Sequence, residues 1–552
     1  DHMMLTNASA TVVDDFEFTA RTKSDQSRGR TTDGAATWSL FPTPTPGAAN
    51  AGASAEYTPR PLLSPGAGFY GGAQNVSITC ADASATIRYT LDGTEPTAAS
   101  PAYAGPIAVG TTAVVRAAAF SATAGVPSSF VETNTYFIGV THTVPVVSVA
   151  GDDLNDLLSG NDGIEPYGTI EYFGEDQQLR DEATGQFNKH GNDSWAYDQR
   201  GFDYVTKDQT GYNDALHYPI FRTRQRDQYQ RLIIKAAAND NYSFEDGAHI
   251  RDAYVHALSQ TGGLRLDVRS YEPCVLYLNG RYWGVYELRE KADDHDYTKE
   301  YYDQDEYDLQ YLKTWGATWS EYGGPQAQTD WDALRTFIQS NNMGDAAAFA
   351  TVDAQFNWKS LVDYVVLNSY TVCSDWLNWN TAWWRGQDPA GEHKKWGYTL
   401  WDNDATFGHY INYTDIPTQA PDADPCNADN LPDPGDQGHI PILVKLMNEN
   451  PEVHDYYINR YADLSNTVFS CDHMIPFLDS LITLIEPEMA AQITRWGGSM
   501  AEWQGNVQEM RDFINTRCTA IQQGMVDCYN LNGPYNVVFK VEPPLSGEIK
   551  IN

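Results

Sequence analysis

Hydrophobic and polar residues alternate with a period of two along the first half of the chain. The runs Asn75–Cys80 and Thr86–Thr90 are separated by turns rich in Gly, Pro and Asp, which predicts short strands throughout residues 57–138. The apolar runs Thr143–Val149 and Arg231–Ala238 predict further strands. We therefore expect the first half to be built mainly from β-structure.

The pattern changes to helical spacing further along the chain. Residues 246–260 carry apolar side chains three and four positions apart, which predicts a helix. Asn279-Gly280 separates the alternating runs Val275–Leu278 and Tyr282–Leu288, the strongest short signal for a hairpin. Beyond residue 330 helices are expected at 331–340, 345–373, 441–448, 451–469, 474–495 and 502–527. A strand-rich part with one helix thus precedes a helix-rich part.

The two ends of the sequence carry their own signals. Asp1-His2-Met3-Met4 resembles a cloning scar, so the absence of a signal peptide carries no weight. Residues 536–552 alternate again and predict the opening strands of a further β module, assigned to 531–552.

The charge of the chain limits its partners. It has 552 residues with 74 acidic and 36 basic side chains, a formal net charge of −38. This charge argues against nucleic acid and anionic membranes, which are both polyanions. It suits a soluble extracellular protein, although a merely solvated acidic surface would give the same charge. No run of eighteen apolar residues occurs, so no transmembrane segment is expected.

Seven cysteines are scattered along the chain. None forms a CxxC pair, which argues against a zinc site. Cys518 and Cys528 lie ten residues apart and are expected to form a local disulfide. The odd number leaves at least one thiol unpaired if the others bond, and the sequence does not reveal the remaining pairing.

Two short acidic motifs carry the candidate chemistry. Asp375 precedes Asn380 by five positions, the spacing of the catalytic Asp and the metal-binding Asn in a kinase loop. Asp402 and Asp404 follow, just before Phe407-Gly408. An Asp, an Asn and a later Asp suit a site in which one carboxylate positions a hydroxyl and the others hold metal ions against phosphates.

Two N-terminal segments resemble known β modules. Ser27–Arg30, Asp33-Gly34, Trp38 and Thr45–Asn50 resemble the end of a lamin-tail domain, so residues 1–50 are expected to be a lamin-tail remnant; a disordered leader is the alternative. Ile87–Thr97, followed by Tyr103 and Pro106-Ile107, resembles the chitobiase/hexosaminidase C-terminal β-sandwich. That module, assigned to 57–138, is an accessory rather than a catalytic domain.

A series of blocks in order resembles the CotH family of atypical secretory kinases over residues 142–530. The blocks are Val144–Val149, Gly163-Ile164, Tyr167-Gly168, Tyr218–Phe221, Arg251-Asp252, Leu278–Lys291, Asp375 with Asn380, and Trp401–Gly408. The resemblance implies a multidomain protein: an α+β, atypical protein-kinase-like bilobal domain preceded by an all-β sandwich module. It also implies ATP and Mg²⁺ or Mn²⁺ as cofactors.

The resemblance assigns roles to the acidic residues. Asp375 would orient and partly deprotonate an acceptor hydroxyl; the alternative is an Asp that ends a helix by bonding its backbone. Asn380 and Asp402 would bind the metal ions, because Mg²⁺ and Mn²⁺ prefer oxygen ligands. Asp404 is either a second metal ligand or a structural group.

The basic side of such a site is less well defined. Lys235 ends a strand just before the predicted helix, where a kinase keeps its nucleotide lysine. In relatives the phosphate lysine follows a Gly-Asn loop, and here Arg200 takes that place, which puts catalytic competence in question because Arg and Lys are not interchangeable. Arg251 could reach phosphate or pair with an acid. Glu290 could accept from nucleotide hydroxyls, fix its basic neighbours, or form a solvated hinge.

One further acidic stretch raises the question of calcium. Asp422, Asp424, Asp429, Asp433 and Asp436 resemble a calcium-type loop but lack the twelve-residue pattern with its terminal Glu. A solvated loop is the simpler interpretation.

The sequence thus favours an extracellular, bacterial, ATP- and metal-dependent kinase that phosphorylates Ser or Thr of an exported or surface protein. Its β modules would attach it to a cell wall or glycan. The alternative is a kinase-fold scaffold or binding module without phosphotransfer. AMP transfer on the same fold is a third reading, because fold does not fix reaction. A glycosidase has little support, since no carboxylate pair can be assigned by spacing.

Overall fold

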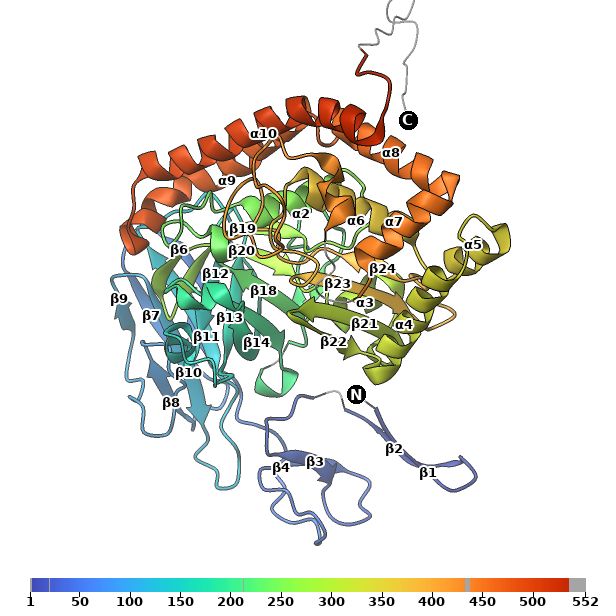
Figure 1. Ribbon diagram of the computed structural model, residues 1–552. Helices are drawn as coiled ribbons and strands as arrows, with labels where there is room; N and C mark the ends of the chain where they lie inside the picture. The colour runs from blue at the N-terminus through green and yellow to red at the C-terminus, as the bar shows by residue number, and fades with distance from the viewer. Residues whose placement is uncertain (1, 19, 212, 432–436, 536–552) are drawn as a thin grey trace, which may run out of the picture. The chain divides into compact units, whose positions relative to one another are not determined.

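The computed structural model describes residues 2–18, 20–211, 213–431 and 437–535 (Figure 1). The chain forms two compact units. Unit 1 runs to Lys235 and also contains Pro273–Tyr286. Unit 2 consists of Ala236–Glu272 and of the chain from Glu287 onward.

Unit 1 contains the predicted β-sandwich. One sheet has the order β6-β11-β10-β8 and the other β5-β7-β9. The strands are β5 (Leu62–Ser64), β6 (Gly68–Tyr70), β7 (Gln74–Thr79), β8 (Thr86–Thr90), β9 (Ile107–Val109), β10 (Ala113–Phe120) and β11 (Glu132–Ile138). Val76 and Ile78 from one sheet pack with Val115 and Tyr136 from the other, so the alternating residues form one core, as the period-two pattern predicts.

A second sheet of unit 1 closes on itself in the order β12-β13-β14-β15-β18-β20-β19. Its strands are β12 (Val146–Ala150), β13 (Tyr167–Phe173), β14 (Leu179–His190), β15 (Gly201–Thr206), β18 (Arg231–Lys235), β19 (Tyr271–Leu278) and β20 (Arg281–Glu290). Strand β18 is shorter than predicted because Ala237 and Ala238 adopt left-handed backbone conformations, which end an extended strand. Asn279 and Gly280 have φ values of 49° and 76°, as a type I′ turn between β19 and β20 requires.

Unit 2 contains the predicted helices. They are α2 (Arg251–Thr261), α3 (His295–Tyr302), α4 (Gly324–Ser340), α5 (Ala346–Asp353), α6 (Trp358–Tyr370), α7 (His439–Glu449), α8 (Pro451–Asn466), α9 (Cys471–Trp496) and α10 (Met500–Tyr529). The single helix predicted over 345–373 is wrong, because α5 and α6 are separate and the Asn357 side chain caps the start of α6. Helices α9 and α10 run side by side (Figure 1).

A four-stranded sheet in unit 2 was not predicted. Its order is β22-β21-β23-β24, from β21 (Leu309–Trp315), β22 (Ala317–Tyr322), β23 (Thr381–Gly386) and β24 (Gly397–Thr399). All its neighbouring pairs are antiparallel. This sheet carries the two acidic motifs, as described below.

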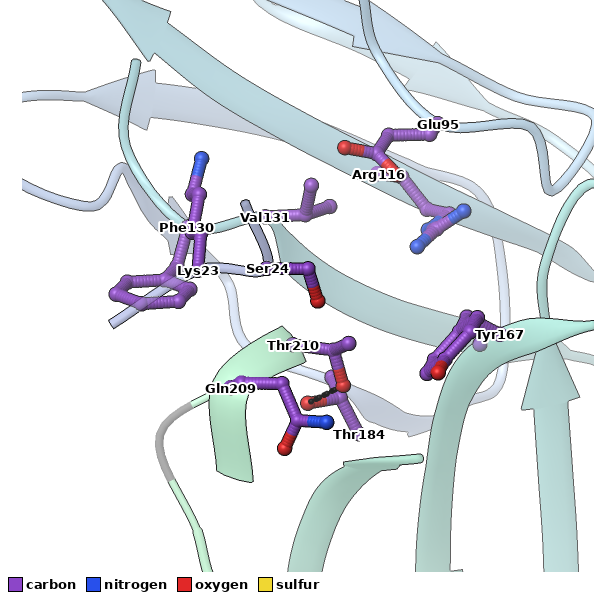
Figure 2. Close-up of a pocket in the computed structure, with 11 residues that line it drawn as sticks. Lys23, Ser24, Glu95, Arg116, Phe130, Val131, Tyr167, Thr184, Gln209 and Thr210 are labelled. Atoms are coloured by element: carbon purple, nitrogen blue, oxygen red, sulfur yellow. Dashed lines mark hydrogen bonds between the residues drawn. The ribbon is translucent and has the colours of Figure 1, made fainter. Parts of the chain in front are cut away.

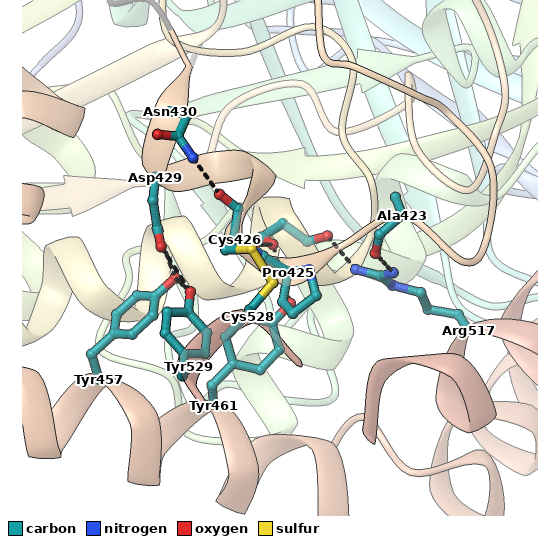
Figure 3. Close-up of a disulfide and its surroundings, with 11 residues drawn as sticks. Ala423, Pro425, Cys426, Asp429, Asn430, Tyr457, Tyr461, Arg517, Cys528 and Tyr529 are labelled. Atoms are coloured by element: carbon teal, nitrogen blue, oxygen red, sulfur yellow. Dashed lines mark hydrogen bonds between the residues drawn. A yellow bond between two sulfur atoms is a disulfide. The ribbon is translucent and has the colours of Figure 1, made fainter. Parts of the chain in front are cut away.

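The cysteine prediction is wrong. Cys426 pairs with Cys528, and Cys471 pairs with Cys518. Cys518 and Cys528 lie on the single helix α10, where ten residues rise by about 15 Å, too far for a disulfide. Beside the first disulfide the Tyr457 and Tyr529 hydroxyls donate to Asp429, and burial raises the pKa of Asp429 to about 6 (Figure 3). Asp429 is therefore half-buried and held by two tyrosines, whereas Asp422 and Asp424 are exposed, as expected of a solvated loop. Asp433 and Asp436 lie outside the described residues.

The terminal predictions have different outcomes. Residues 2–41 form two hairpins, β1 (His2–Thr6) with β2 (Val12–Glu17) and β3 (Ser27–Arg30) with β4 (Trp38–Phe41), while their assignment to a lamin tail stays a prediction. The strands predicted for 536–552 lie outside the described residues.

Within the described ranges no single helix is long and apolar enough to cross a membrane. Only α8 and α9 taken together, across a 59° bend, reach the required length and composition.

A buried carboxylate lies inside unit 1. The Thr135 backbone N–H and hydroxyl both donate to Glu171, which is 1% exposed. Burial, with a contribution from Glu182, raises the pKa of Glu171 to about 8. Burial likewise raises the pKa of Glu132 to about 7, against the attraction of Arg60. At a pH between their ordinary and their raised pKa values, Glu171 and Glu132 therefore keep protons in the folded unit that they would release in the unfolded chain.

The first prediction concerns the proton on the Glu171 carboxyl group. Glu171 stabilises the fold fully below its ordinary pKa of 4.5, and this contribution is lost as the pH rises through about 8. Glu171→Gln mimics the protonated acid, so its melting temperature should exceed that of the wild type by several degrees at pH 8 to 9. The difference should vanish near pH 4.5. Thermal unfolding across this range tests the prediction, with the exposed Glu17→Gln as control. A difference that is independent of pH would refute it.

Candidate functional site

The two acidic motifs meet at one end of the sheet in unit 2. Strands β23 and β24 are antiparallel, with Ala382 opposite Thr399. Asn380 lies just before β23 and Asp402 lies three residues after the end of β24, so both lie at the same end of this pair. The structure brings the motifs together, whereas the metal-binding roles of Asn380 and Asp402 stay predictions.

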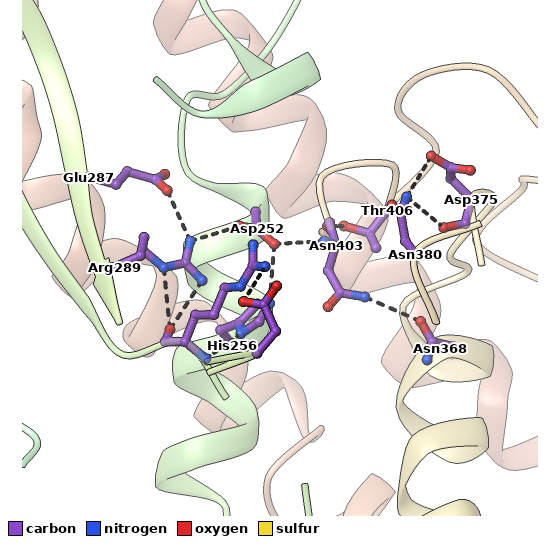
Figure 4. Close-up of polar contacts among 11 residues, drawn as sticks. Asp252, His256, Glu287, Arg289, Asn368, Asp375, Asn380, Asn403 and Thr406 are labelled. Atoms are coloured by element: carbon purple, nitrogen blue, oxygen red, sulfur yellow. Dashed lines mark hydrogen bonds and ion pairs between the residues drawn. The ribbon is translucent and has the colours of Figure 1, made fainter. Parts of the chain in front are cut away.

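Asp375 and Asn380 contact each other directly. The Asn380 side-chain amide donates to Oδ2 of Asp375 over 2.9 Å and to its backbone carbonyl over 3.3 Å (Figure 4). Asn380 is 5% exposed and has a φ of 48°, a left-handed conformation that Asn tolerates better than most residues. Because the amide nitrogen faces Asp375, the amide oxygen is directed toward other partners.

The backbone after Asp402 is fixed by hydrogen bonds. Asp402 is half-buried with a φ of 46°, and the next residue, Asn403, donates its backbone N–H to Asp252 over 2.6 Å. Asp404 is 1% exposed and accepts from the Asn239 backbone N–H over 2.6 Å. Asp404 was predicted to be a metal ligand or a structural group, and its hydrogen bond to the Asn239 backbone agrees with the structural role.

Asp252 is the centre of a buried group that we call the Asp252 cluster: Asp252, His256, Glu287 and Arg289 (Figure 4). Nη1 of Arg289 lies 2.7 Å from Oδ2 of Asp252 and 3.0 Å from Oε2 of Glu287. Burial lowers the pKa of His256 to about 4, so its ring is neutral 3.3 Å from Oδ1 of Asp252. One arginine is thus shared by two carboxylates, which holds Asp252 in place for Asn403.

Arg251 and Glu290 are both buried in unit 2. The Arg251 guanidinium pairs with Asp240, which also accepts from the backbone N–H groups of Ile250 and Arg251 and so fixes the start of α2. Of the two roles predicted for Arg251, the structure displays pairing with an acid. Glu290 is fully buried and accepts from the Tyr301 hydroxyl over 2.7 Å, so a solvated hinge is ruled out.

Arg200 and Lys235 belong to unit 1. The Arg200 guanidinium donates to the backbone carbonyls of Trp195 and Leu158, which gives it a structural partner on each side. Lys235 is the last residue of β18 and is 3% exposed. Their roles in binding phosphate stay predictions.

A cationic group at the same end of the unit 2 sheet was missed by sequence reasoning. We call it the Asp293 cluster: Arg269, Lys291, Asp293 and Lys313. Nζ of Lys313 lies 2.5 Å from Oδ2 of Asp293, and Nη2 of Arg269 lies 3.4 Å from Oδ1. Burial opposes ionisation of Asp293, yet Lys291, Lys313 and Arg269 hold its pKa well below the ordinary value. The missed signal was a lysine inside the apolar strand β21, where charged side chains are rarely buried without a partner.

The residues at this sheet end fit a divalent metal held together with phosphates. Among the described residues no group of three or more His, Cys, Asp or Glu is placed to hold a metal. Nucleotide-bound Mg²⁺ needs fewer, since one or two carboxylates and the phosphates supply its ligands. Asp402 offers a carboxylate and Asn380 an amide oxygen, and the buried Oδ1 of Asn403 accepts no hydrogen bond within the described ranges. These oxygen donors suit a hard cation.

A separate cavity of about 340 Å³ lies within unit 1 (Figure 2). Lys23, Glu95, Arg116, Tyr167 and Thr210 are among the residues that line it. The guanidinium of Arg116 donates to the Gly93 carbonyl, and burial lowers the pKa of Lys23. None of the eight predicted site residues lines this cavity, so the predicted chemistry does not lie there.

The second prediction tests the Asp252 cluster. Asp252→Asn should lower the free energy of unfolding by roughly 1.5–3 kcal/mol, because it removes one of the two carboxylates that compensate the fully buried Arg289 and leaves only Glu287. Denaturant unfolding measures the change. Asp246→Asn, an exposed position on the same segment, should stay within about 0.5 kcal/mol of the wild type. Equal stability of both variants would show that Glu287 alone is a sufficient counter-charge for Arg289.

Comparison with known proteins identifies both major parts of the chain. The family model described as CotH kinase protein matches residues 190–521, and the model of the chitobiase/beta-hexosaminidase C-terminal domain matches residues 65–132. No curated protein matches the chain. Both matches fall within the ranges that the sequence blocks predicted, and the α+β multidomain layout agrees with them. The chain therefore belongs to the CotH kinase protein family and carries a chitobiase/hexosaminidase-type β-sandwich before its kinase-like domain.

Proposed function

We propose that this protein is an extracellular kinase that transfers the γ-phosphoryl group of ATP to a Ser or Thr hydroxyl of an exported or surface protein. The observation that carries the proposal is the meeting of Asp375, Asn380 and Asp402 at one sheet end in a chain of the CotH family. Phosphoryl transfer needs positioning and charge stabilisation more than covalent chemistry, and these groups are suited to both.

Asp375 is the proposed base. Its carboxylate would accept the proton of the acceptor hydroxyl as the oxygen–phosphorus bond forms. The Asn380 amide holds Oδ2 of Asp375, which fixes the orientation of the carboxylate. Because proton transfer is a small part of a loose phosphoryl transition state, the main contribution of Asp375 is to orient the hydroxyl.

Asp402 and Asn380 are the proposed metal-binding residues. Bound Mg²⁺ or Mn²⁺ would supply the positive charge that neutralises the phosphates. The Asp252 cluster keeps the backbone beside Asp402 in place through Asn403, so it acts as a positioning element. Asp404 contributes through its bond to the Asn239 backbone.

The proposed location outside the cell is supported by the cysteines. Two disulfides are typical of proteins from oxidising compartments. The β-sandwich module would attach the kinase-like domain to a cell wall or another extracellular glycan. The expected partners are therefore this glycan and the acceptor protein. Calcium remains a further candidate ion for the acidic stretch around Asp429.

One observation favours the alternative of a kinase-fold scaffold without phosphotransfer. Arg200 stands where relatives are expected to carry a phosphate lysine, and its guanidinium already bonds two backbone carbonyls. A chain that lost its phosphate lysine could keep the fold for binding alone.

The third prediction separates these functions. Purified protein with Mg-ATP or Mn-ATP and a Ser/Thr-containing acceptor should transfer phosphate. Asp375→Asn should slow transfer by roughly 100- to 10,000-fold and keep ATP binding. Asp402→Asn should lose the rise in melting temperature that Mg-ATP gives to the wild type. Radiolabel transfer and thermal shift measure these effects, and Asp246→Asn is the control.

Three outcomes are distinct. Protein that neither binds Mg-ATP nor transfers phosphate would support the scaffold. Transfer that survives Asp375→Asn would remove the proposed base. An acceptor whose mass grows by AMP rather than by phosphate would change the reaction class.

A further inference from the structure

We propose that Lys313, held by Asp293 and flanked by Arg269 and Lys291, binds the phosphates of the nucleotide. The proposal rests on the proposed function, because it adds a basic residue to the acidic side of the proposed kinase site. Its ligand class is a polyphosphate, such as the triphosphate of ATP.

The pairing of the strands places Lys313 beside the acidic motifs. Strand β21 is antiparallel to β23, with Lys313 opposite Ala382 and Thr314 opposite Thr381, the residue after Asn380. Next to this position the Gly316 backbone N–H donates to the Asn378 carbonyl over 2.7 Å. Lys313 therefore lies at the sheet end that carries Asn380.

The second acidic motif also contacts Lys313. Its ammonium lies 4.3 Å from the centre of the Trp401 ring, and Trp401 directly precedes Asp402. A cation over an aromatic face is attracted by the ring. The contact holds the ammonium against the residue that precedes Asp402, on the segment that carries the proposed metal-binding carboxylate.

The charge at this place is unusual for the chain. Lys291, Lys313 and Arg269 all lower the pKa of one carboxylate, Asp293, in a chain with 74 acidic and only 36 basic side chains. The second carboxylate near Lys313 is the part-exposed Glu321, at 3.9 Å. Nη1 of Arg269, a residue only 3% exposed, has no hydrogen-bond partner among the described residues. Buried donors without acceptors are costly, and a phosphate would satisfy them.

Two of the predicted cations already have structural partners. Arg251 forms a buried pair with Asp240, and Arg200 donates to backbone carbonyls. The Lys313 ammonium carries three hydrogens, of which Asp293 accepts one, so hydrogens are left for another acceptor. In a protein kinase the phosphate lysine is likewise held by one carboxylate while it contacts the phosphates.

The fourth prediction uses binding rather than activity. Titration calorimetry of the full chain with tripolyphosphate and with Mg-ATP should give affinities that Lys313→Met weakens by about 10- to 100-fold, the loss expected for a charge-assisted contact. Lys394→Met, an exposed lysine of the same unit, should bind both probes like the wild type. Asp293 keeps Arg269 and Lys291 in the Lys313→Met variant, so its charge stays compensated.

A second variant separates binding from folding. Lys313→Arg keeps a positive charge beside Asp293, so it should be folded and should bind both probes more tightly than Lys313→Met does. A folded Lys313→Met protein that binds both probes like the wild type would overturn the inference and leave the proposed kinase activity untouched. Loss of binding in Lys313→Met, beside a wild type that binds both probes but transfers no phosphate, would support the inference and reject the kinase. A wild type that binds neither probe would overturn both.

Discussion

The Asp252 carboxylate forms an ion pair with the guanidinium of Arg289 and also accepts a hydrogen bond from the backbone N–H of Asn403. Both side chains of the ion pair are almost fully buried, so each charge would be costly without the other. The backbone that carries Asp402 is therefore fixed by an interaction that the fold has to keep. Neutral His256 completes the surroundings of Asp252 without adding a competing charge. The backbone next to Asp402 is thus held by a buried ion pair that would be costly to break.

The need of a buried charge for an opposite partner also bears on the basic residues near the site. In a chain with a net charge of −38, a buried cation needs its own carboxylate. Arg251 has Asp240 and Arg289 has two acids, so both are internal supports. The Asp293 cluster is different, since Lys291, Lys313 and Arg269 all act on the same carboxylate, Asp293. Together with the unsatisfied Nη1 of Arg269, this gathering of cations supports the proposed anionic ligand.

Much of the fold could be predicted from the sequence because it follows from local patterns. The Asn279-Gly280 hairpin and the late helices depend on backbone preference and periodicity, which are encoded within a few residues. The disulfides could not be predicted, since Cys426 and Cys528 lie 102 residues apart and meet only after folding. Asp375, Asn380 and Asp402 could be proposed from the sequence because their spacing is a recognisable motif, and their roles stay predictions. Lys313 was missed because its meaning depends on partners from β23 and from the Trp401 segment.

Arg200 shows why family membership does not settle the reaction. A substitution at a motif position reads as loss of function only if no other residue can take over the charge. Here the arginine bonds carbonyls within unit 1, and a lysine that no motif marks contacts Trp401, beside the proposed metal-binding Asp402 in the sequence of unit 2. A point-like ammonium on a short strand end can contact phosphate oxygens without the geometric demands of a guanidinium. Whether the chain can bind a nucleotide therefore depends on which basic side chain can still contact phosphate. The pairing of β21 with β23 makes Lys313 the residue to test.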